Sequence, residues 1–465
     1  MGSPTKSPSP APSIPSTAPR VPIPPNGVDY RGKIVLAPMV RSGELPSRLL
    51  ALKYGADLVW GPETIDKSLI GCNRHINPRN SMVEFSRIPS NGGRQIEAAK
   101  ESIIYRLDPQ REKGRLIFQI GTASPDLAVQ AGKMIAGDVA GIDVNAGCPK
   151  PFSTSGGMGA ALLQTPDRLV SILTALVKEV GTPFQIGISV KIRILDEPER
   201  TRDLVTRLCA TGITGLTVHC RTTPMRPRER AIRDQLPMIA SICKNAGVAI
   251  LANGDVESRD HGHALMKEYG VDGAMIATCA EANSSCFRSA EQGGLLPWRD
   301  VVRDYMEFCL ECENKWGNTK YLLNQLIPGK EKVFQSAKQS KSYWTCCKAL
   351  GFEDLLERAR IVDEVIGRPS IEELEEGQQQ GVNKKSKKNK SPAVQKAMLT
   401  ETAKAAGTNG SSSAANGSRT GKDRGVGSKT GNNSPALDEM PNPPDAAAVS
   451  MDMAAAAPVA SPLHG

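Results

Sequence analysis

The sequence is poor in aromatic residues, and the shortage is concentrated at its two ends. Aromatic residues make up 4% of the 465-residue chain, and Pro, Ser, Gly, Ala and Asn dominate the segments before residue 30 and after residue 370. Segments of this composition cannot bury enough apolar surface to offset the entropy lost on ordering. We therefore expect residues 1–29 to form a disordered Pro/Ser-rich leader and residues 370–465 a disordered low-complexity tail.

The sequence also lacks a long apolar run and an amphipathic leader. No run approaches the roughly 20 apolar residues that a membrane-spanning helix needs, so we expect a soluble protein with no membrane partner. The many prolines of the first 25 residues prevent an amphipathic targeting helix from forming. A cleaved organelle peptide is the alternative to a disordered leader.

The 11 cysteines follow no regular spacing. This excludes the disulfide framework of a small secreted protein and indicates free thiols in a reducing compartment. We expect the cytoplasm, with the nucleus as a second compartment. Cys309 and Cys312 form one CxxC pair, but no second ligand pair stands at zinc spacing, so we expect no metal site. The lysine cluster at 384–390 fits a nuclear signal, an RNA-attracting arm or a solvated run of charge.

Eight short β-rich segments alternate with helix-like stretches between Lys33 and Cys279. The segments begin at residues 33, 56, 116, 141, 187, 215, 249 and 273, and the clearest helical stretches are 46–54, 125–136, 166–180, 200–210 and 235–245. This alternation predicts an α/β fold, a (β/α)8 TIM barrel over residues 30–295. A doubly wound open sheet is the alternative. Polar residues and glycines end nearly every strand, which favours the barrel because a barrel keeps its active site there.

From Leu296 the strand pattern stops and helical patterns continue, so we expect a small helical domain over residues 296–369. Between Lys315 and Lys348 stand seven lysines and one acid, Glu331, interleaved with aromatic residues. A cationic surface with aromatic neighbours suits a nucleic-acid backbone. The alternative is an ordinary solvated helix face with its aromatics in the core. The net charge of +9, of which +6 falls in residues 30–366, is compatible with nucleic acid without requiring it.

The residues that end the predicted strands form one candidate site. All would point into the barrel mouth, meaning the carboxyl ends of the eight strands and the loops that follow them. One cysteine, one lysine and one histidine with amide side chains between them suggest a planar polar cofactor and a proton donor. These residues are Pro38, Met39, Gln119, Asn145, Cys148, Lys191, His219, Asn253 and Gly254.

Five motifs follow one another in the order found in tRNA-dihydrouridine synthases, and the chain resembles that family over roughly residues 30–365. The motifs are APM at 37–39, NAGCP at 145–149, VKIR at 190–193, TVHCRT at 217–222 and ANGDV at 252–256. The stretches GELPSRLLALKYGADLVWGPETID and NAGCPKPFSTSGGMGAALL resemble the eukaryotic branch that modifies the D-loop uridine at tRNA position 20.

The resemblance implies FMN as cofactor and NADPH as reductant. It assigns flavin contacts to Pro38, Met39, Gln119, Lys191, His219, Asn253 and Gly254, and the catalytic role to Cys148. The sequence departs from the family at one point, because Thr278 stands where an arginine commonly helps to hold the FMN phosphate. Backbone amides of Gly254, Ala277 and Thr278 are the expected replacement.

The implied reaction gives a role to several further residues. Reduction of the uracil C5=C6 bond needs a hydride at C6 and a proton at C5, and an ordinary thiol is largely protonated near neutral pH, which suits Cys148 as the acid. Asn145 is our candidate for a hydrogen bond to the uracil, which must flip out of its loop. We expect Arg221, Arg226, Arg228 and Lys320 to contact the tRNA and the protein to be a monomer. The alternative for the three arginines is a surface loop paired to acids elsewhere.

Two other functions stay open on the sequence alone. One is an FMN-dependent dehydrogenase of a free pyrimidine, against which the lysine-rich helical region argues. The other is a tRNA-binding protein that has lost its flavin, which the missing arginine at Thr278 keeps open. Schiff-base chemistry at Lys191 is conceivable for any barrel lysine, but it leaves the NAGCP loop unexplained.

Overall fold

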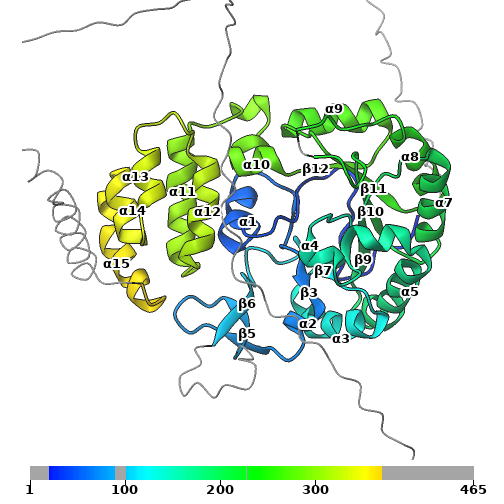
Figure 1. Ribbon diagram of the computed structural model, residues 1–465, viewed down its shortest axis with the longest axis horizontal. Coiled ribbons are helices and arrows are strands. Elements are labelled where there is room, and N and C mark those ends of the chain that lie inside the picture. Colours follow the sequence, from blue (N-terminus) through cyan, green and yellow to red (C-terminus); the bar gives the residue numbers. More distant parts are fainter. Residues whose placement is uncertain (1–19, 89–100, 227, 369–465) are drawn as a thin grey trace, which may run out of the picture. The chain divides into compact units, whose positions relative to one another are not determined.

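Eight parallel strands close into a barrel in this computed structural model, which describes residues 20–88, 101–226 and 228–368. The barrel strands are β1 (Ile34–Leu36), β2 (Leu58–Trp60), β7 (Leu116–Gly121), β8 (Gly141–Ala146), β9 (Gly187–Arg193), β10 (Gly215–His219), β11 (Ala249–Asn253) and β12 (Gly273–Ile276). Each pairs with its neighbours in parallel, and pairing of β2 with β7 completes the ring (Figure 1). All eight expected strands are present, so the barrel is confirmed and the open sheet is excluded.

Alternation along the strands divides the apolar side chains between two cores. Successive residues of a strand point to opposite sides. Ile142 and Val144 of β8 therefore pack in the large cluster beneath the helices, while Asp143 and Asn145 point inward. The inward-facing apolar residues form a separate cluster near the amino ends of the strands, made of Tyr30, Val35, Ala37, Leu58, Trp60, Ile117, Ala140, Ala249, Leu251 and Met275. Filling that end with apolar side chains leaves the polar ones at the barrel mouth.

Helices follow most of the barrel strands and cover the outside of the ring (Figure 1). They are α1 (Leu45–Lys53), α3 (Pro125–Ile135), α5 (Pro166–Leu176), α7 (Pro198–Cys209), α8 (Leu236–Ala246) and α9 (Arg259–Tyr269), with the short helices α2 (Asp66–Leu69), α4 (Pro151–Thr154), α6 (Thr182–Phe184) and α10 (Thr278–Ala282). Proline opens several of them, where its missing N–H costs nothing. Gly247 and Gly270 end α8 and α9 in the left-handed conformation, the usual stop for a helix.

Part of the expected disordered leader is ordered instead. Residues 20–29 run across the amino end of the barrel, where Val21 N donates to Gly247 O at 3.0 Å and Asn26 N donates to Gln185 O at 2.9 Å. Tyr30 then closes this end from inside, and a Cβ on Gly215 would lie 2.5 Å from its ring. The expectation of disorder rested on the proline-rich composition, which gives no information about these tertiary contacts. The rest of the leader, residues 1–19, and the tail from residue 369 lie outside the described residues.

Two further parts pack beside the barrel. The sequence pattern did not predict a three-stranded antiparallel sheet of β4 (Asn73–Ile76), β5 (Val83–Arg87) and β6 (Ser102–Leu107), or the two-residue strand β3 (Thr64–Ile65) that pairs with β7. The expected helical region contains α11 (Trp298–Glu311), α12 (Trp316–Leu326), α13 (Phe334–Gln339), α14 (Tyr343–Leu350) and α15 (Leu356–Val365). Within the described part of the chain, no helix is long and apolar enough to cross a membrane.

Candidate active site

A polar layer lies inside the barrel, directly above the apolar cluster. Asp143 is completely buried, and its two oxygens accept hydrogen bonds of 2.8 Å from Gln119 Nε2 and from Ser189 Oγ. Burial raises the pKa of Asp143 to about 6, against the effect of these donors and of nearby Lys191. Asp143 was not among the residues predicted from the sequence, although an acid in the middle of the apolar strand GIDVNA was the available signal.

Lys191 lies on β9 between its register partners Asn145 and Thr217. Burial lowers the pKa of Lys191 to about 8, and the Asp143 carboxylate opposes this by favouring the ammonium. Asp143 is thus the anionic partner that a lysine inside a strand requires. Among the described residues, Lys191 Nζ makes no hydrogen bond, so its donors remain for a ligand.

The loop after β8 holds Cys148 at the edge of this layer. Asn145 Oδ1 accepts from the backbone N–H groups of Gly147 at 2.9 Å and Cys148 at 3.0 Å. Arg193, which was not predicted from the sequence, anchors the same loop by donating to Gly147 O at 2.8 Å. Burial raises the pKa of the half-buried Cys148 thiol. The loop therefore presents a neutral thiol, which can donate a proton but is a weak nucleophile.

His219 is held as a neutral imidazole. Its pKa is lowered far below the usual value, first by burial and then by three nearby cations. Arg221 Nη1 lies 3.3 Å from His219 Nε2, and because a guanidinium can only donate, the imidazole proton is on Nδ1. Arg221 is itself 4% exposed and donates to Glu229 O and to the Asp255 carboxylate. The guanidinium that we expected to contact tRNA is thus committed to internal contacts that shape its loop.

The remaining flavin candidates line the same end of the barrel. Asn253 pairs in register with His219, and its Nδ2 donates to Met275 O at 2.9 Å. Gly254 follows with φ +106, and a Cβ there would lie 3.1 Å from His219 Cδ2. At the end of β1, half-buried Met39 packs against both the inner and the outer apolar cluster, directly after Pro38.

The candidates for phosphate and RNA contacts lie on more open parts of the chain. Thr278 is the exposed first residue of α10, and half-buried Ala277 precedes it. Arg226 and Arg228 are exposed in the loop after β10. Lys320 is half-buried on α12, where its Nζ donates to Ser340 O at 2.9 Å. Among the described residues, none of these side chains hydrogen-bonds or pairs with Cys148.

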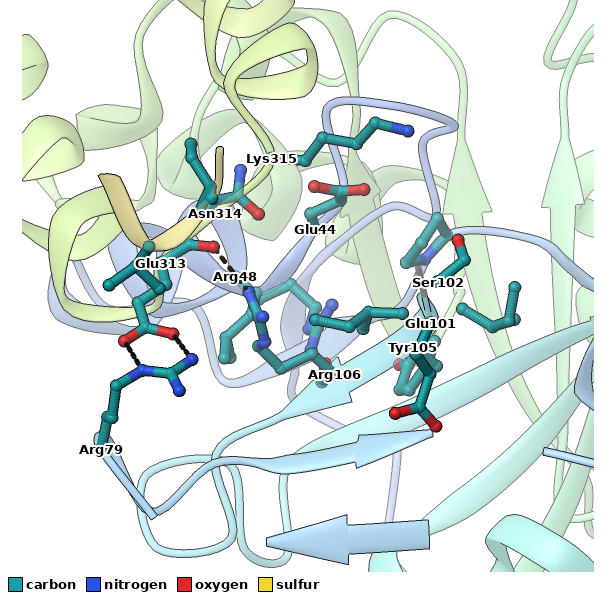
Figure 2. A pocket seen from close by; sticks show the side chains of 16 residues that line it. Glu44, Arg48, Arg79, Glu101, Ser102, Tyr105, Arg106, Glu313, Asn314 and Lys315 are labelled. Atoms are coloured by element: carbon teal, nitrogen blue, oxygen red, sulfur yellow. Dashed lines mark hydrogen bonds and ion pairs between the residues drawn. The ribbon is translucent and has the colours of Figure 1, made fainter. Parts of the chain in front are cut away.

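A cavity of about 350 Å³ lies between α1, β6 and the start of α12, and Cys148 is not among the residues that line it (Figure 2). Its arginines are already paired, as Arg79 with Glu313 and Arg106 with Glu84. Glu44 lies in the same cavity and is hydrogen-bonded by the Asn318 side chain. This paired lining offers no free cation cluster for a phosphate among the described residues, and we assign it no ligand.

Comparison of the sequence with known proteins identifies one family. The profile described as "Dihydrouridine synthase (Dus)" matches residues 35–365. A tRNA-dihydrouridine(20) synthase of Schizosaccharomyces pombe is 50% identical over 331 residues, covering 70% of this chain and 66% of that protein. The enzyme of the same description from Saccharomyces cerevisiae is 48% identical over 322 residues, covering 68% of this chain and 82% of that protein. A human tRNA-dihydrouridine(20a/20b) synthase-like protein is 28% identical over 312 residues, covering 66% and 87%. The chain therefore belongs to the dihydrouridine synthase family.

Proposed function

We propose that this chain reduces uridine 20 of the tRNA D loop to dihydrouridine, with FMN as its flavin and NADPH as the reductant. Family membership makes it a flavin-dependent oxidoreductase, and two yeast relatives carry the position 20 in their names. The observation that carries the proposal is the arrangement of a neutral Cys148 thiol at the edge of a barrel interior that contains Gln119, Lys191 and His219.

The groups inside the barrel suit the polar edge of a flavin. Gln119 uses its amide N–H on Asp143, which leaves its carbonyl oxygen to accept from a ring N–H. Lys191 supplies a cation with no hydrogen-bond acceptor among the described residues. His219 and Asn253 complete the set, and Gly254 keeps the backbone open, because a side chain there would press on the imidazole. When bound, FMN reduced by NADPH supplies the hydride that uracil receives at C6.

Cys148 then acts as the general acid at C5. Its S–H bond breaks as the C5–H bond forms, and the thiolate left behind recovers a proton from solvent. Asn145 Oδ1 accepts from the two backbone N–H groups of the loop, and its Nδ2 faces the Glu63 carboxyl. We assign to this Nδ2 a hydrogen bond to a uracil carbonyl when the base is bound. The same side chain thus positions the acid and recognises the base.

The phosphate of FMN would be held without the usual arginine. Thr278 begins α10, and the peptide of Ala277 before it adopts φ −121 and ψ −89, a conformation outside helix and strand. We propose that the N–H groups of Gly254, Ala277 and Thr278 bind the phosphate, with Pro38 and Met39 packing against the flavin.

Recognition of tRNA requires the target uridine to flip into the barrel mouth. We assign backbone contacts to Arg226 and Arg228, which are exposed, and to Lys320. Arg221 acts through the loop whose Glu229 carbonyl it holds. A monomer in the cytoplasm, with the nucleus as a second compartment, completes the proposal.

The decisive experiment measures dihydrouridine at each D-loop position by mass spectrometry in tRNA from cells lacking this protein. Re-expressed wild type should restore position 20, and Cys148→Ala should not. Cys72→Ala is the matched control, because Cys72 is another half-buried thiol, directly before β4 and outside the barrel strands. Unchanged dihydrouridine on deletion would contradict the proposal and direct attention to free pyrimidines or to RNA binding without chemistry.

A further inference from the structure

Glu63 lies close to Cys148 although the two residues are far apart in the sequence. It follows β2, and its Oε1 accepts a hydrogen bond of 2.9 Å from Ser153 Oγ. Ser153 Oγ and Cys148 O both approach Gly159, where a Cβ would lie 2.4 Å from the first and 2.6 Å from the second. The segment after β2 and the cysteine loop therefore meet through the Glu63–Ser153 hydrogen bond, and Ser153 in turn lies beside Gly159 and the Cys148 carbonyl.

The second oxygen of this carboxyl is buried and unsatisfied. Glu63 Oε2 has no hydrogen-bond partner among the described residues. Space for the carboxyl is made by Gly121 on β7, where a Cβ would lie 2.6 Å from Glu63 Oε1. A buried acceptor without a donor destabilises the fold, and groups of this kind call for an explanation other than stability.

We propose that Glu63 is a positioning residue that keeps Cys148 in the thiol form, so that the general acid carries its proton before each turnover. A negative charge beside a thiol opposes the second negative charge of a thiolate. The inference rests on the proposed role of Cys148 and extends it, since nothing in that role requires a carboxylate nearby.

The other charges around Cys148 explain why such a residue is needed. Lys191 and Arg193 both favour the thiolate, since their positive charges lie near Cys148. Burial raises the pKa of the Cys148 thiol, the Lys150 N–H lowers it, and Glu63 raises it again. The pKa of Glu63 is itself raised by burial, while Ser153, Cys148 and Asn145 favour its charged form. Glu63 thus offsets cations that the flavin site and the loop both require.

The test follows the alkylation of Cys148 by iodoacetamide across a pH series, read from the Cys148 peptide by mass spectrometry. Only the thiolate reacts. Glu63→Gln keeps an oxygen that can accept from Ser153 and removes the charge. We expect its alkylation midpoint to fall by about one pH unit, and the thiolate fraction below both midpoints to rise about tenfold. The alkaline limb of the pH–rate profile should shift to lower pH by the same amount as the alkylation midpoint.

Matched variants separate charge from structure. Glu44→Gln alters another carboxyl whose pKa burial raises, and it should leave the Cys148 midpoint unchanged. Glu63→Asp keeps the charge one methylene farther away, and its midpoint should lie between those of the wild type and Glu63→Gln. An unchanged midpoint in a Glu63→Gln protein that melts cooperatively would overturn the inference. If that variant does not fold, a Glu63→Asp midpoint at or above the wild-type value would overturn it.

Failure of the proposed function would look different. If the Cys148→Ala variant still formed dihydrouridine, Cys148 would not be the general acid, whatever the result of the alkylation series. If the alkylation midpoint of Cys148 did not change on substitution of Glu63, Cys148 could still be the general acid, and only the proposed effect of Glu63 on its protonation would be refuted.

Discussion

Gln119 Nε2 donates a 2.8 Å hydrogen bond to Asp143 Oδ2 between the neighbouring strands β7 and β8, inside the barrel. Ser189 Oγ, on β9, donates a hydrogen bond to the other carboxylate oxygen of Asp143. Held from both sides, Asp143 cannot rotate without breaking a bond to one neighbour. It therefore sets which face of the Gln119 amide is turned toward a ligand, and its charge supports the ammonium of Lys191.

Loss of the Asp143 charge should weaken flavin binding. In Asp143→Asn the Gln119 amide can flip, and Lys191 loses its anionic partner. Hydrogen bonds to charged groups contribute about 1.5–3 kcal/mol, so we expect the Kd for FMN to rise at least about tenfold. Fluorescence titration of the flavin-free protein measures this. Ser189→Ala, which removes one bond and no charge, should have a smaller effect, and an unchanged Kd in Asp143→Asn would contradict the assignment.

Flavin affinity should depend on pH through Lys191. Burial lowers the pKa of Lys191 to about 8, so the ammonium is present below that pH and disappears as the pH rises through it. An anionic cofactor should accordingly bind more weakly above pH 8 than below it. Titrations between pH 6.5 and 9.5 test this, with Lys191→Met as the control that should bind weakly and show no step near pH 8. A step that persists in Lys191→Met would assign the titration to another group.

Breaking the Arg48–Glu112 ion pair should destabilise the fold. The N–O distance is 2.6 Å and both side chains are 1% exposed, and Arg48 also donates to Gly43 O and Arg106 O. Glu112→Gln leaves a buried charge without its partner, so we expect the free energy of unfolding to fall by about 3–5 kcal/mol. Denaturant titration measures this. The control Glu199→Ala removes an exposed pair with Arg202 and should cost less than about 1 kcal/mol.

The arginines of the loop after β10 should support tRNA affinity in a salt-dependent way. Removing one arginine that binds a phosphate should reduce the steepness of log K against log salt by somewhat less than one. Arg226→Ala and Arg228→Ala should each weaken binding and flatten that slope, as measured by filter binding at several salt concentrations. The exposed Arg202 on α7 supplies the control variant, Arg202→Ala. If the slope of log K against log salt were the same in the wild type and in all three variants, this loop would not be part of the tRNA interface.

The sequence was sufficient to place the residues that end strands at the barrel mouth, but not to predict contacts between side chains that are distant in the chain. Cys148, Lys191 and His219 stand out because their chemistry is unusual at a strand end. Asp143 and Glu63 were not among the predicted residues, because the contacts that single them out come from side chains on other elements, at distances in the chain that no spacing rule covers. Arg221 was assigned to tRNA from its place in a basic loop, with pairing to acids elsewhere as the alternative, and the sequence could not show its ion pair with Asp255 after the following strand.

The sequence by itself determined the alternation of strands and helices, and with it a barrel whose polar residues gather at one end, because periodicity and strand-end composition are local properties. It also carried the motifs of the family. Only the tertiary structure decided that the barrel closes through β2 and β7, that residues 20–29 cover its amino end, and that Glu63 lies beside the cysteine. Those outcomes depend on which surfaces become buried against one another. Burial between segments that are distant in the chain is a property of the folded protein, whereas the hydrophobic pattern is a property of the local sequence.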